Sequence, residues 1–168
     1  MKIGILGGSF DPAHKGHLAI SKEAKKRFKL EKIIWAVTKK NPLKAESKTP
    51  ISKKIKDCKK IIGMNSFIKV KFYENIIKSN KTIDLINYIK KNKNIEIFFL
   101  MGADNLISFH RWHKSELISQ KCNIIVFDRH GYKKNSLKSK TFKRLNNKTL
   151  TFVEFKKVNI SSSQLRKI

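Results

Sequence analysis

The sequence GGSFDPAHKGH, from Gly7 to His17, directly follows the short apolar run Ile3–Leu6. A near-continuous apolar run of this kind predicts a strand of a parallel sheet that is buried on both faces. Two glycines at the end of such a strand allow the backbone to turn tightly and to approach a ligand closely. The amides of this turn, and the positive end of a following helix, attract anions. The stretch therefore predicts an anion site at the end of the first strand of a parallel sheet.

The remainder of the chain alternates predicted strands with predicted helices. We expect strands at 2–6, 32–37, 67–73, 95–101, 123–127 and 149–155. We expect helices at 15–28, 51–62, 82–91 with Thr82 as its N-cap, 104–120 with a break near His110, and 161–167. Residues 38–50 are predicted as a polar loop and 129–147 as a basic loop with room for a short helix. This alternation predicts an α/β fold with a doubly wound parallel sheet, in a single domain over residues 1–168.

Two histidines give the opening stretch its chemistry. His14 and His17 are three residues apart, so they share a face of the first turn of the predicted helix. Gly16 between them leaves room for a ligand. The pair lacks a third local ligand, so we expect no metal site here. Imidazoles donate hydrogen bonds to phosphate oxygens, and in such sheets ligands bind beyond the carboxyl ends of the strands.

The stretch Gly7–His17 resembles the signature of the class I nucleotidyltransferases, G-[ST]-F-D-P-x-H-x-G-H. That resemblance implies a Rossmann-like fold and transfer of a nucleotidyl group. It also implies that His14 and His17 contact the phosphates of ATP. The ATP-binding residues that it implies near the N-terminus are Gly7, Gly8, Ser9, Phe10 and Gly16.

A second predicted phosphate site lies near the C-terminus, in Ile160-Ser161-Ser162-Ser163-Gln164-Leu165-Arg166. Read alone, the serines are a simple helix cap. The segment resembles the family element ISS[ST]xxR, however, which implies that Ile160, Ser161, Ser162 and Ser163 bind ATP. Hydroxyls and free amides at a helix start suit phosphate, and Arg166 adds a charged donor fork. The resemblance therefore implies a catalytic set of His14, His17 and Arg166.

The middle of the chain predicts the second substrate. Gly102-Ala103-Asp104-Asn105-Leu106, followed by Phe109-His110-Arg111-Trp112-His113, resembles the nicotinate-nucleotide adenylyltransferases. By this resemblance Asp104 holds ribose hydroxyls and Trp112 stacks on the pyridine ring. The nicotinate mononucleotide site that it implies comprises Lys44, Thr82, Asp84, Gly102, Asp104 and Trp112. Without the motif, Trp112 would be read as core packing, and Thr82 and Asp84 as a helix start.

The reaction implied is adenylyl transfer from ATP to nicotinate mononucleotide, which yields nicotinate adenine dinucleotide and pyrophosphate in NAD biosynthesis. Mg²⁺ would arrive with ATP, without dedicated protein ligands. Three alternatives remain open: a nicotinamide-mononucleotide enzyme, a pantetheine-phosphate adenylyltransferase, and a non-catalytic basic module that binds nucleic acid. The turn Phe127–Tyr132 lacks the proline of the family's Arg-Pro-Gly pattern, so we assign it no role.

The charge of the chain is strongly positive, with 39 Lys and Arg against 12 Asp and Glu, a net of +27. A nucleic-acid binder would show such an excess. The lysines are spread over the whole chain, however, and abundant Lys, Asn and Ile also follow from A/T-rich coding. We favour the second explanation and expect no specific nucleic acid. The two cysteines and the lack of a membrane-length apolar run predict a cytoplasmic protein with small-molecule substrates and no membrane partner. A homo-oligomer is compatible with the sequence.

Overall fold

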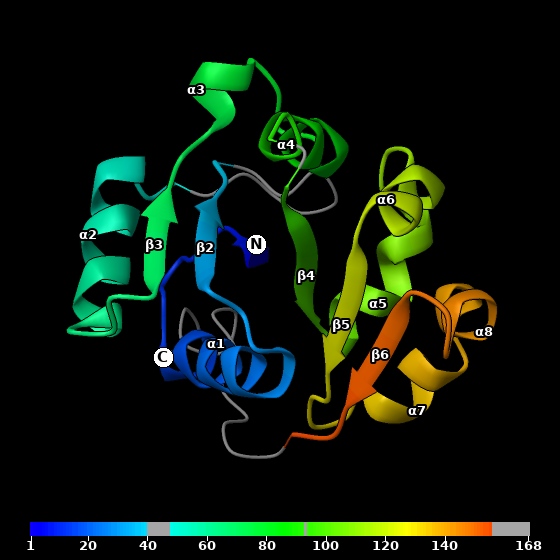
Figure 1. Cartoon of the computed structure of the whole chain (residues 1–168). Helices are drawn as coiled ribbons and strands as arrows, with labels where there is room; N and C mark the ends of the chain where they lie inside the picture. The colour runs from blue at the N-terminus through cyan, green and yellow to red at the C-terminus, as the bar shows by residue number, and fades with distance from the viewer. Residues whose placement is uncertain (40–47, 93, 156–168) are drawn as a thin grey trace.

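One parallel sheet organises the described part of the chain, which comprises residues 1–39, 48–92 and 94–155 of a computed structural model (Figure 1). Its strands lie in the order β3-β2-β1-β4-β5-β6. The strands are β1 (Lys2–Gly8), β2 (Lys32–Val37), β3 (Ile68–Lys71), β4 (Glu96–Gly102), β5 (Asn123–Phe127) and β6 (Leu150–Val153). The helices are α1 (Lys15–Phe28), α2 (Ile51–Ile62), α3 (Glu74–Ile77), α4 (Thr82–Ile89), α5 (Ala103–Ser108), α6 (Ser115–Lys121), α7 (Lys133–Leu137) and α8 (Lys140–Leu145), with a 3₁₀ turn η1 (Phe109–Arg111).

The strand order places the expected ligand-binding edge of the sheet beside β1. The chain moves outward from β1 through β2 to β3, and then returns to the other side of β1 to build β4, β5 and β6. The order therefore reverses between β1 and β4, which pair directly in parallel. In doubly wound sheets, ligands bind at this switch point, outside the carboxyl ends of the strands. The predicted Rossmann-like α/β fold is confirmed, and the segments after β1 and β4 meet at its expected binding edge.

The core consists of two apolar layers, one on each face of the sheet. Ile3 and Ile5 of β1 pack with α4, α5, α6 and α8, while Leu6 packs with α1 and α2 on the opposite face. Because successive side chains of a strand point to opposite faces, a strand covered on both faces has to be apolar throughout. This explains why β1 and β4 read as continuous apolar runs. No helix within the described residues combines the length and apolarity needed to cross a bilayer.

Local periodicity predicted several elements to the residue, namely α1, β2, α2 and β5. The break expected near His110 is confirmed, because η1 separates α5 from α6 there. The strand expected at 67–73 is shorter, and α3 follows it. The predicted helix at 161–167 lies outside the described residues.

One prediction about local structure was wrong, and another was incomplete. Thr82 is the first helical residue of α4, and its N-cap is Lys81, which makes no side-chain capping hydrogen bond. The segment 129–147, predicted as a basic loop with room for a short helix, holds two short helices. The second of them, α8, begins at a conventional cap, since the Ser139 hydroxyl accepts a hydrogen bond from the Phe142 amide at 3.1 Å. Because the segment is rich in lysine, Ser139 was not recognised in the sequence as a helix cap.

Candidate active site

The turn after β1 is made by Phe10. Gly7 and Gly8 continue the strand and pair with Ala36 and Val37 of β2, so the prediction that these glycines form the turn was wrong. Phe10 adopts the left-handed conformation, with φ of 48°. Such a conformation is uncommon for a residue with a side chain, and burial compensates for it here. The Phe10 ring is 2% exposed and stacks on Trp35 with centroids 5.2 Å apart.

His14 and His17 form a capping box at the start of α1. His14 is the N-cap, and its Nδ1 accepts a hydrogen bond from the Gly16 amide at 3.0 Å. The Nδ1 of His17 accepts in turn from the His14 amide at 3.1 Å. A ring nitrogen that accepts carries no proton, so each neutral imidazole has its proton on Nε2. The helix start thus holds both rings as Nε2–H donors, with their centroids 3.9 Å apart.

Both imidazoles are neutral at physiological pH. Burial lowers the pKa of His14 to about 4, and the positive charge of Arg129 contributes in the same direction. The pKa of His17 also lies well below 6.5, chiefly because the ring is buried, with further lowering from His14 and Arg129. Neutral rings keep the Nε2–H donors that phosphate oxygens require. The free protein therefore presents two uncharged donors beside one fixed cation.

The buried ring of Trp35 lies beside His17 and is linked to its backbone through hydrogen bonds. Trp35 of β2 is fully buried, and its Nε1–H donates to the Ser21 hydroxyl at 2.8 Å. That hydroxyl donates to the His17 carbonyl, also at 2.8 Å. The Trp35 ring lies 5.8 Å from the His17 ring, measured between centroids. This chain of contacts ties the first turn of α1 to the centre of the sheet.

An ion pair occupies the neighbouring end of β4 and β5. Arg129, two residues beyond the end of β5, donates from Nη1 to Oδ2 of Asp104 at 2.7 Å. Gly102 makes this packing feasible, because a Cβ there would lie 2.6 Å from Asp104 Oδ1, closer than real Cβ atoms come. Asp104 Oδ1 is buried and has no hydrogen-bond partner among the described residues. An acceptor so placed is ready for a donor supplied by a ligand.

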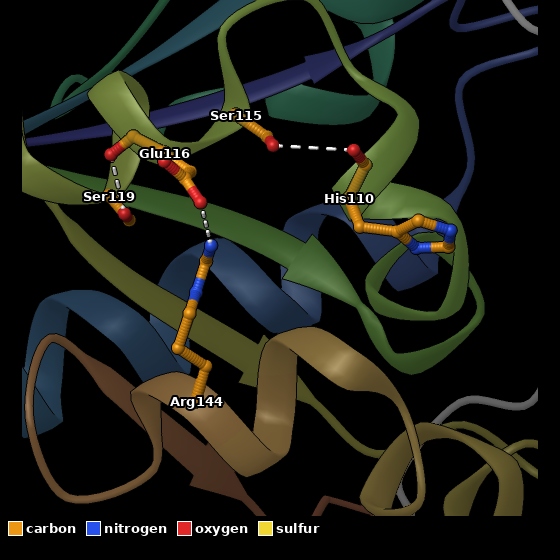
Figure 2. A network of polar contacts seen from close by, with 5 residues as sticks. All are labelled: His110, Ser115, Glu116, Ser119 and Arg144. Atoms are coloured by element: carbon orange, nitrogen blue, oxygen red, sulfur yellow. Dashed lines mark hydrogen bonds and ion pairs between the residues drawn. The ribbon is translucent and has the colours of Figure 1, made fainter.

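Trp112 lies in the turn between α5 and α6. Its half-buried ring packs on Phe109 with centroids 5.1 Å apart, and edge-on against Phe99 at 5.9 Å. Figure 2 shows how the turn is closed: the Ser115 hydroxyl donates to the His110 carbonyl at 3.4 Å. The indole therefore contributes to the core and still keeps exposed surface.

The polar contacts of α6 continue beyond this turn. In Figure 2 the ion pair between Glu116 and Arg144, at 2.6 Å, joins α6 to α8. Both side chains are well exposed, so the pair adds little to stability. Its geometry nevertheless links α8 to the helix that begins just after Trp112.

The segment after β2 is tied down on both sides of the undescribed residues 40–47. The Thr38 hydroxyl donates to the carboxylate of Glu74 at 2.8 Å, and the Thr38 carbonyl accepts from Nζ of Lys54 at 3.2 Å. On the far side, the Thr49 hydroxyl donates to Oδ1 of Asp11 at 2.6 Å. The last contact joins this segment to the turn that precedes His14. Lys54 is 1% exposed, which is unusual for lysine.

Thr82 and Asp84 lie at the start of α4. Oδ2 of Asp84 accepts from the Ser79 hydroxyl at 2.6 Å, and that hydroxyl oxygen also accepts from the Lys81 amide at 3.0 Å. The carboxylate thus organises the turn that leads into α4. These contacts stay within the turn, whereas His14, His17, Asp104 and Arg129 form the group that the fold brings together.

Comparison with known proteins assigns the family. The cytidylyltransferase-like family model matches residues 5–168. A protein of Pelagibacter ubique (strain HTCC1062), named probable nicotinate-nucleotide adenylyltransferase, is 66% identical over 167 residues, which cover 99% of this chain and 93% of that protein. This chain belongs to the nicotinate-nucleotide adenylyltransferases, within the cytidylyltransferase-like family. A relative of the same name from Agrobacterium fabrum (strain C58 / ATCC 33970) is 37% identical over 78% of this chain and 71% of its own length.

Solved structures share the fold of this family member. The nicotinic acid mononucleotide adenylyltransferase of Plasmodium falciparum, complexed with NaAD, superposes with a TM-score of 0.79 at 23% identity. The same protein complexed with APC gives a TM-score of 0.80 at 24% identity. Each comparison covers 99% of this chain and 82% of the other.

Several residues implied by the family motifs lie outside the described residues. They are Lys44, Ile160, Ser161, Ser162, Ser163 and Arg166. Conversely, the structure adds Arg129 and Lys54, to which sequence reasoning gave no role. Arg129 carried a usable signal, because it lies two residues beyond the end of a buried strand, where doubly wound folds place their chemistry. No sequence signal pointed to Lys54, since a lysine in a lysine-rich helix is expected to be exposed.

Proposed function

We propose that this adenylyltransferase family member transfers the adenylyl group of ATP to nicotinate mononucleotide, releasing nicotinate adenine dinucleotide and pyrophosphate. The observation that carries the proposal is the pair of neutral Nε2–H donors, His14 and His17, beside the ion pair of Asp104 and Arg129. This set lies at the switch point of a nucleotide-binding sheet. The names of the relatives support nicotinate mononucleotide as the acceptor.

The chemistry needs positioning more than acid–base catalysis. An oxygen of the mononucleotide phosphate attacks the α-phosphorus of ATP, the bond to the bridging oxygen breaks, and pyrophosphate leaves with that oxygen. The attacking oxygen is already anionic, so no side chain has to remove a proton. His14 and His17 would donate hydrogen bonds to the phosphate oxygens of ATP. These bonds would stabilise the negative charge that grows on the leaving pyrophosphate during the reaction. ATP would enter as its Mg²⁺ complex, and that Mg²⁺ is part of the substrate.

The acceptor site is proposed around Asp104 and Trp112. The buried Oδ1 of Asp104 lacks a partner among the described residues and would accept from a ribose hydroxyl. The exposed part of the Trp112 ring would stack on the pyridinium. Thr82, Asp84 and Lys44 would complete the site, and the segment from Ile160 to Arg166 would hold the ATP phosphates.

The deciding experiment measures pyrophosphate release from Mg-ATP with each candidate acceptor in turn. We expect rapid release with nicotinate mononucleotide and slower release with nicotinamide mononucleotide. Chromatography should identify nicotinate adenine dinucleotide as the product. Release with phosphopantetheine alone, or with no acceptor, would refute the assignment.

We also propose that the protein works in the cytoplasm. Cys58 and Cys122 are buried free thiols in different core layers, on opposite faces of the sheet. Burial raises the pKa of each thiol to about 12, so neither forms a reactive thiolate at neutral pH. Buried free thiols of this kind suit a reducing compartment.

A further inference from the structure

We propose that Trp35 is a positioning residue for the adenylyl transfer. It fixes the turn at Phe10 and the first turn of α1 relative to each other, and thereby aims the Nε2–H donor of His17. This role rests on the proposed function and falls to a residue of β2 that contacts no substrate in the proposed mechanism. Ser21 of α1 is the second member of the arrangement, because it connects the indole to the backbone of His17.

The single N–H donor of the Trp35 indole is directed at the helix turn that carries the histidines. It donates to the Ser21 hydroxyl at 2.8 Å, and that hydroxyl donates to the carbonyl oxygen of His17 at 2.8 Å. Trp35 and Ser21 are both completely buried. An indole has no other hydrogen-bond donor, so the whole donor capacity of Trp35 is used to hold this turn. A relay of two hydrogen bonds therefore joins the strand to the helix start inside the core.

The indole ring also holds the segment that precedes the histidines. Phe10 stacks on it with centroids 5.2 Å apart and an interplanar angle of 17°. The Phe10 ring in turn lies 4.6 Å from the His17 ring, measured between centroids. Because Phe10 has a φ of 48°, its left-handed turn persists only where neighbouring groups hold it. Trp35 thus contacts residues at both ends of the loop that is expected to bind ATP.

The relay places polar atoms where the core could be entirely apolar. A buried N–H or hydroxyl costs free energy unless it is hydrogen-bonded, and an apolar side chain would fill the same space without that requirement. In return, a fully satisfied buried network fixes one relative position of the groups that it joins. Donors to a reacting phosphate need that precision, since a displacement of about 1 Å can cost roughly 100-fold in rate.

A purely structural role of Trp35 predicts a different result from a positioning role. A structural role would lower the free energy of unfolding and leave the turnover of the folded protein unchanged. Positioning predicts that kcat falls about tenfold in the folded protein, because His17 is present but misaligned. The KM for nicotinate mononucleotide should then change less than about twofold, since the acceptor site is not disturbed.

The experiment compares two variants that break the relay at different points. Trp35→Phe keeps a stacking ring and removes the N–H, whereas Ser21→Ala keeps the indole and removes the hydroxyl. The matched control is Ser136→Ala, since Ser136 is also completely buried and its hydroxyl donates to the Lys133 carbonyl at 2.8 Å. We expect kcat to fall about tenfold in each relay variant and to keep its wild-type value in the control. The double variant should be no slower than the slower single variant, because both changes break one relay.

Nuclear magnetic resonance gives a readout that does not depend on turnover. The indole N–H signal of Trp35 is identified by its absence from Trp35→Phe, and pyrophosphate is added as a probe that needs no acceptor. We expect saturating pyrophosphate to shift this signal in the wild-type protein and in Ser136→Ala. The shift should be much smaller in Ser21→Ala, because the hydroxyl that connects the indole to His17 is gone.

Three outcomes would overturn the inference. They are a wild-type kcat in Ser21→Ala, whatever the stability of Trp35→Phe, losses of kcat that multiply in the double variant, and an indole signal that does not respond to saturating pyrophosphate. Failure of the proposed function would look different, because the wild-type protein would then release no pyrophosphate from ATP with nicotinate mononucleotide. The pyrophosphate titration would still test the coupling of Trp35 to His17.

Discussion

At the scale of single residues, the proposed function gives one imidazole two tasks. His14 is the N-cap of α1 at the end of the loop after β1, and its Nδ1 accepts a hydrogen bond from the Gly16 amide. Its Nε2–H is therefore the atom left for a substrate. The cap orients the Nε2–H, so under the proposed function one ring makes a structural hydrogen bond and a substrate-binding one. Substitution can separate the two tasks, because asparagine is an excellent cap and lacks an atom at the Nε2 position.

We expect His14→Asn to keep the fold and to lose activity. Its Oδ1 should still accept from the Gly16 amide, so the free energy of unfolding should change by less than about 1 kcal/mol. Loss of the donor should lower kcat at least about 100-fold. His14→Ala should lose both functions and unfold more readily. Near-normal turnover of His14→Asn at saturating ATP would contradict the donor role.

The same ring predicts how stability depends on pH. Unfolded histidine titrates near pH 6.5, whereas the pKa of folded His14 is about 4 and that of His17 is also lowered. As the pH falls from 6.5 towards 4, the unfolded chain binds protons that the folded protein does not. The free energy of unfolding should therefore decrease over this range and be independent of these rings above it. Urea denaturation at several pH values should show this decrease, with a smaller slope in His14→Asn.

At the scale of elements, α2 shows how a helix can carry a charged group inside the fold. Its apolar residues Ile51, Ile55, Cys58 and Ile62 recur at helical spacing along one face. Lys54 lies among them with its stem buried, and its ammonium reaches the Thr38 carbonyl at the end of β2. The helix is thereby fixed to the carboxyl edge of the sheet, where the proposed site lies.

We expect Lys54→Ala to destabilise the protein by about 2–5 kcal/mol, the range for truncating a long buried side chain. Lys54→Met keeps most of the stem and should cost less, because it removes the polar contacts of the ammonium, including the bond to Thr38, and leaves the apolar packing in place. Lys60→Ala on the exposed side of the same helix is the control, expected within about 0.5 kcal/mol of wild type. Equal stability of all three variants by thermal or urea unfolding would show that Lys54 does not fix the helix.

At the scale of the whole molecule, the charge of +27 is the dominant property. Exposed lysines occur on α1, α2, α7 and α8 alike, which cover both faces of the sheet. A field of this kind attracts any polyanion, including ATP, without selecting among them. The charge should therefore accelerate encounter with substrate and produce weak, non-specific binding to nucleic acid.

Non-specific attraction of polyanions by this charge predicts two effects of salt. Raising salt from about 50 to 200 mM should abolish most binding to a random-sequence DNA duplex in a fluorescence assay. Over the same range kcat/KM for ATP should fall while kcat stays constant, because screening slows encounter rather than chemistry. Tight duplex binding that persists at the higher salt would instead support a nucleic-acid function.

Much of the fold could be predicted because its cues are local. The bounds of α1 and α2 follow from apolar residues at helical spacing, and β2 and β5 from short apolar runs. His14 was expected on the first helical turn, whereas the structure makes it the N-cap of α1. Thr82 was misplaced because a threonine before an apolar stretch resembles a cap, although Lys81 holds that position.

The sequence by itself determined the alternation of strands and helices and the pairing of His14 with His17, because both depend on residues within a few positions of one another. Only the tertiary structure decided that Arg129 meets Asp104, 25 residues away, and that Lys54 reaches Thr38. The left-handed turn at Phe10 likewise depends on its stacking with Trp35. Such contacts join separate elements, and their geometry exists only after the sheet has brought those elements together.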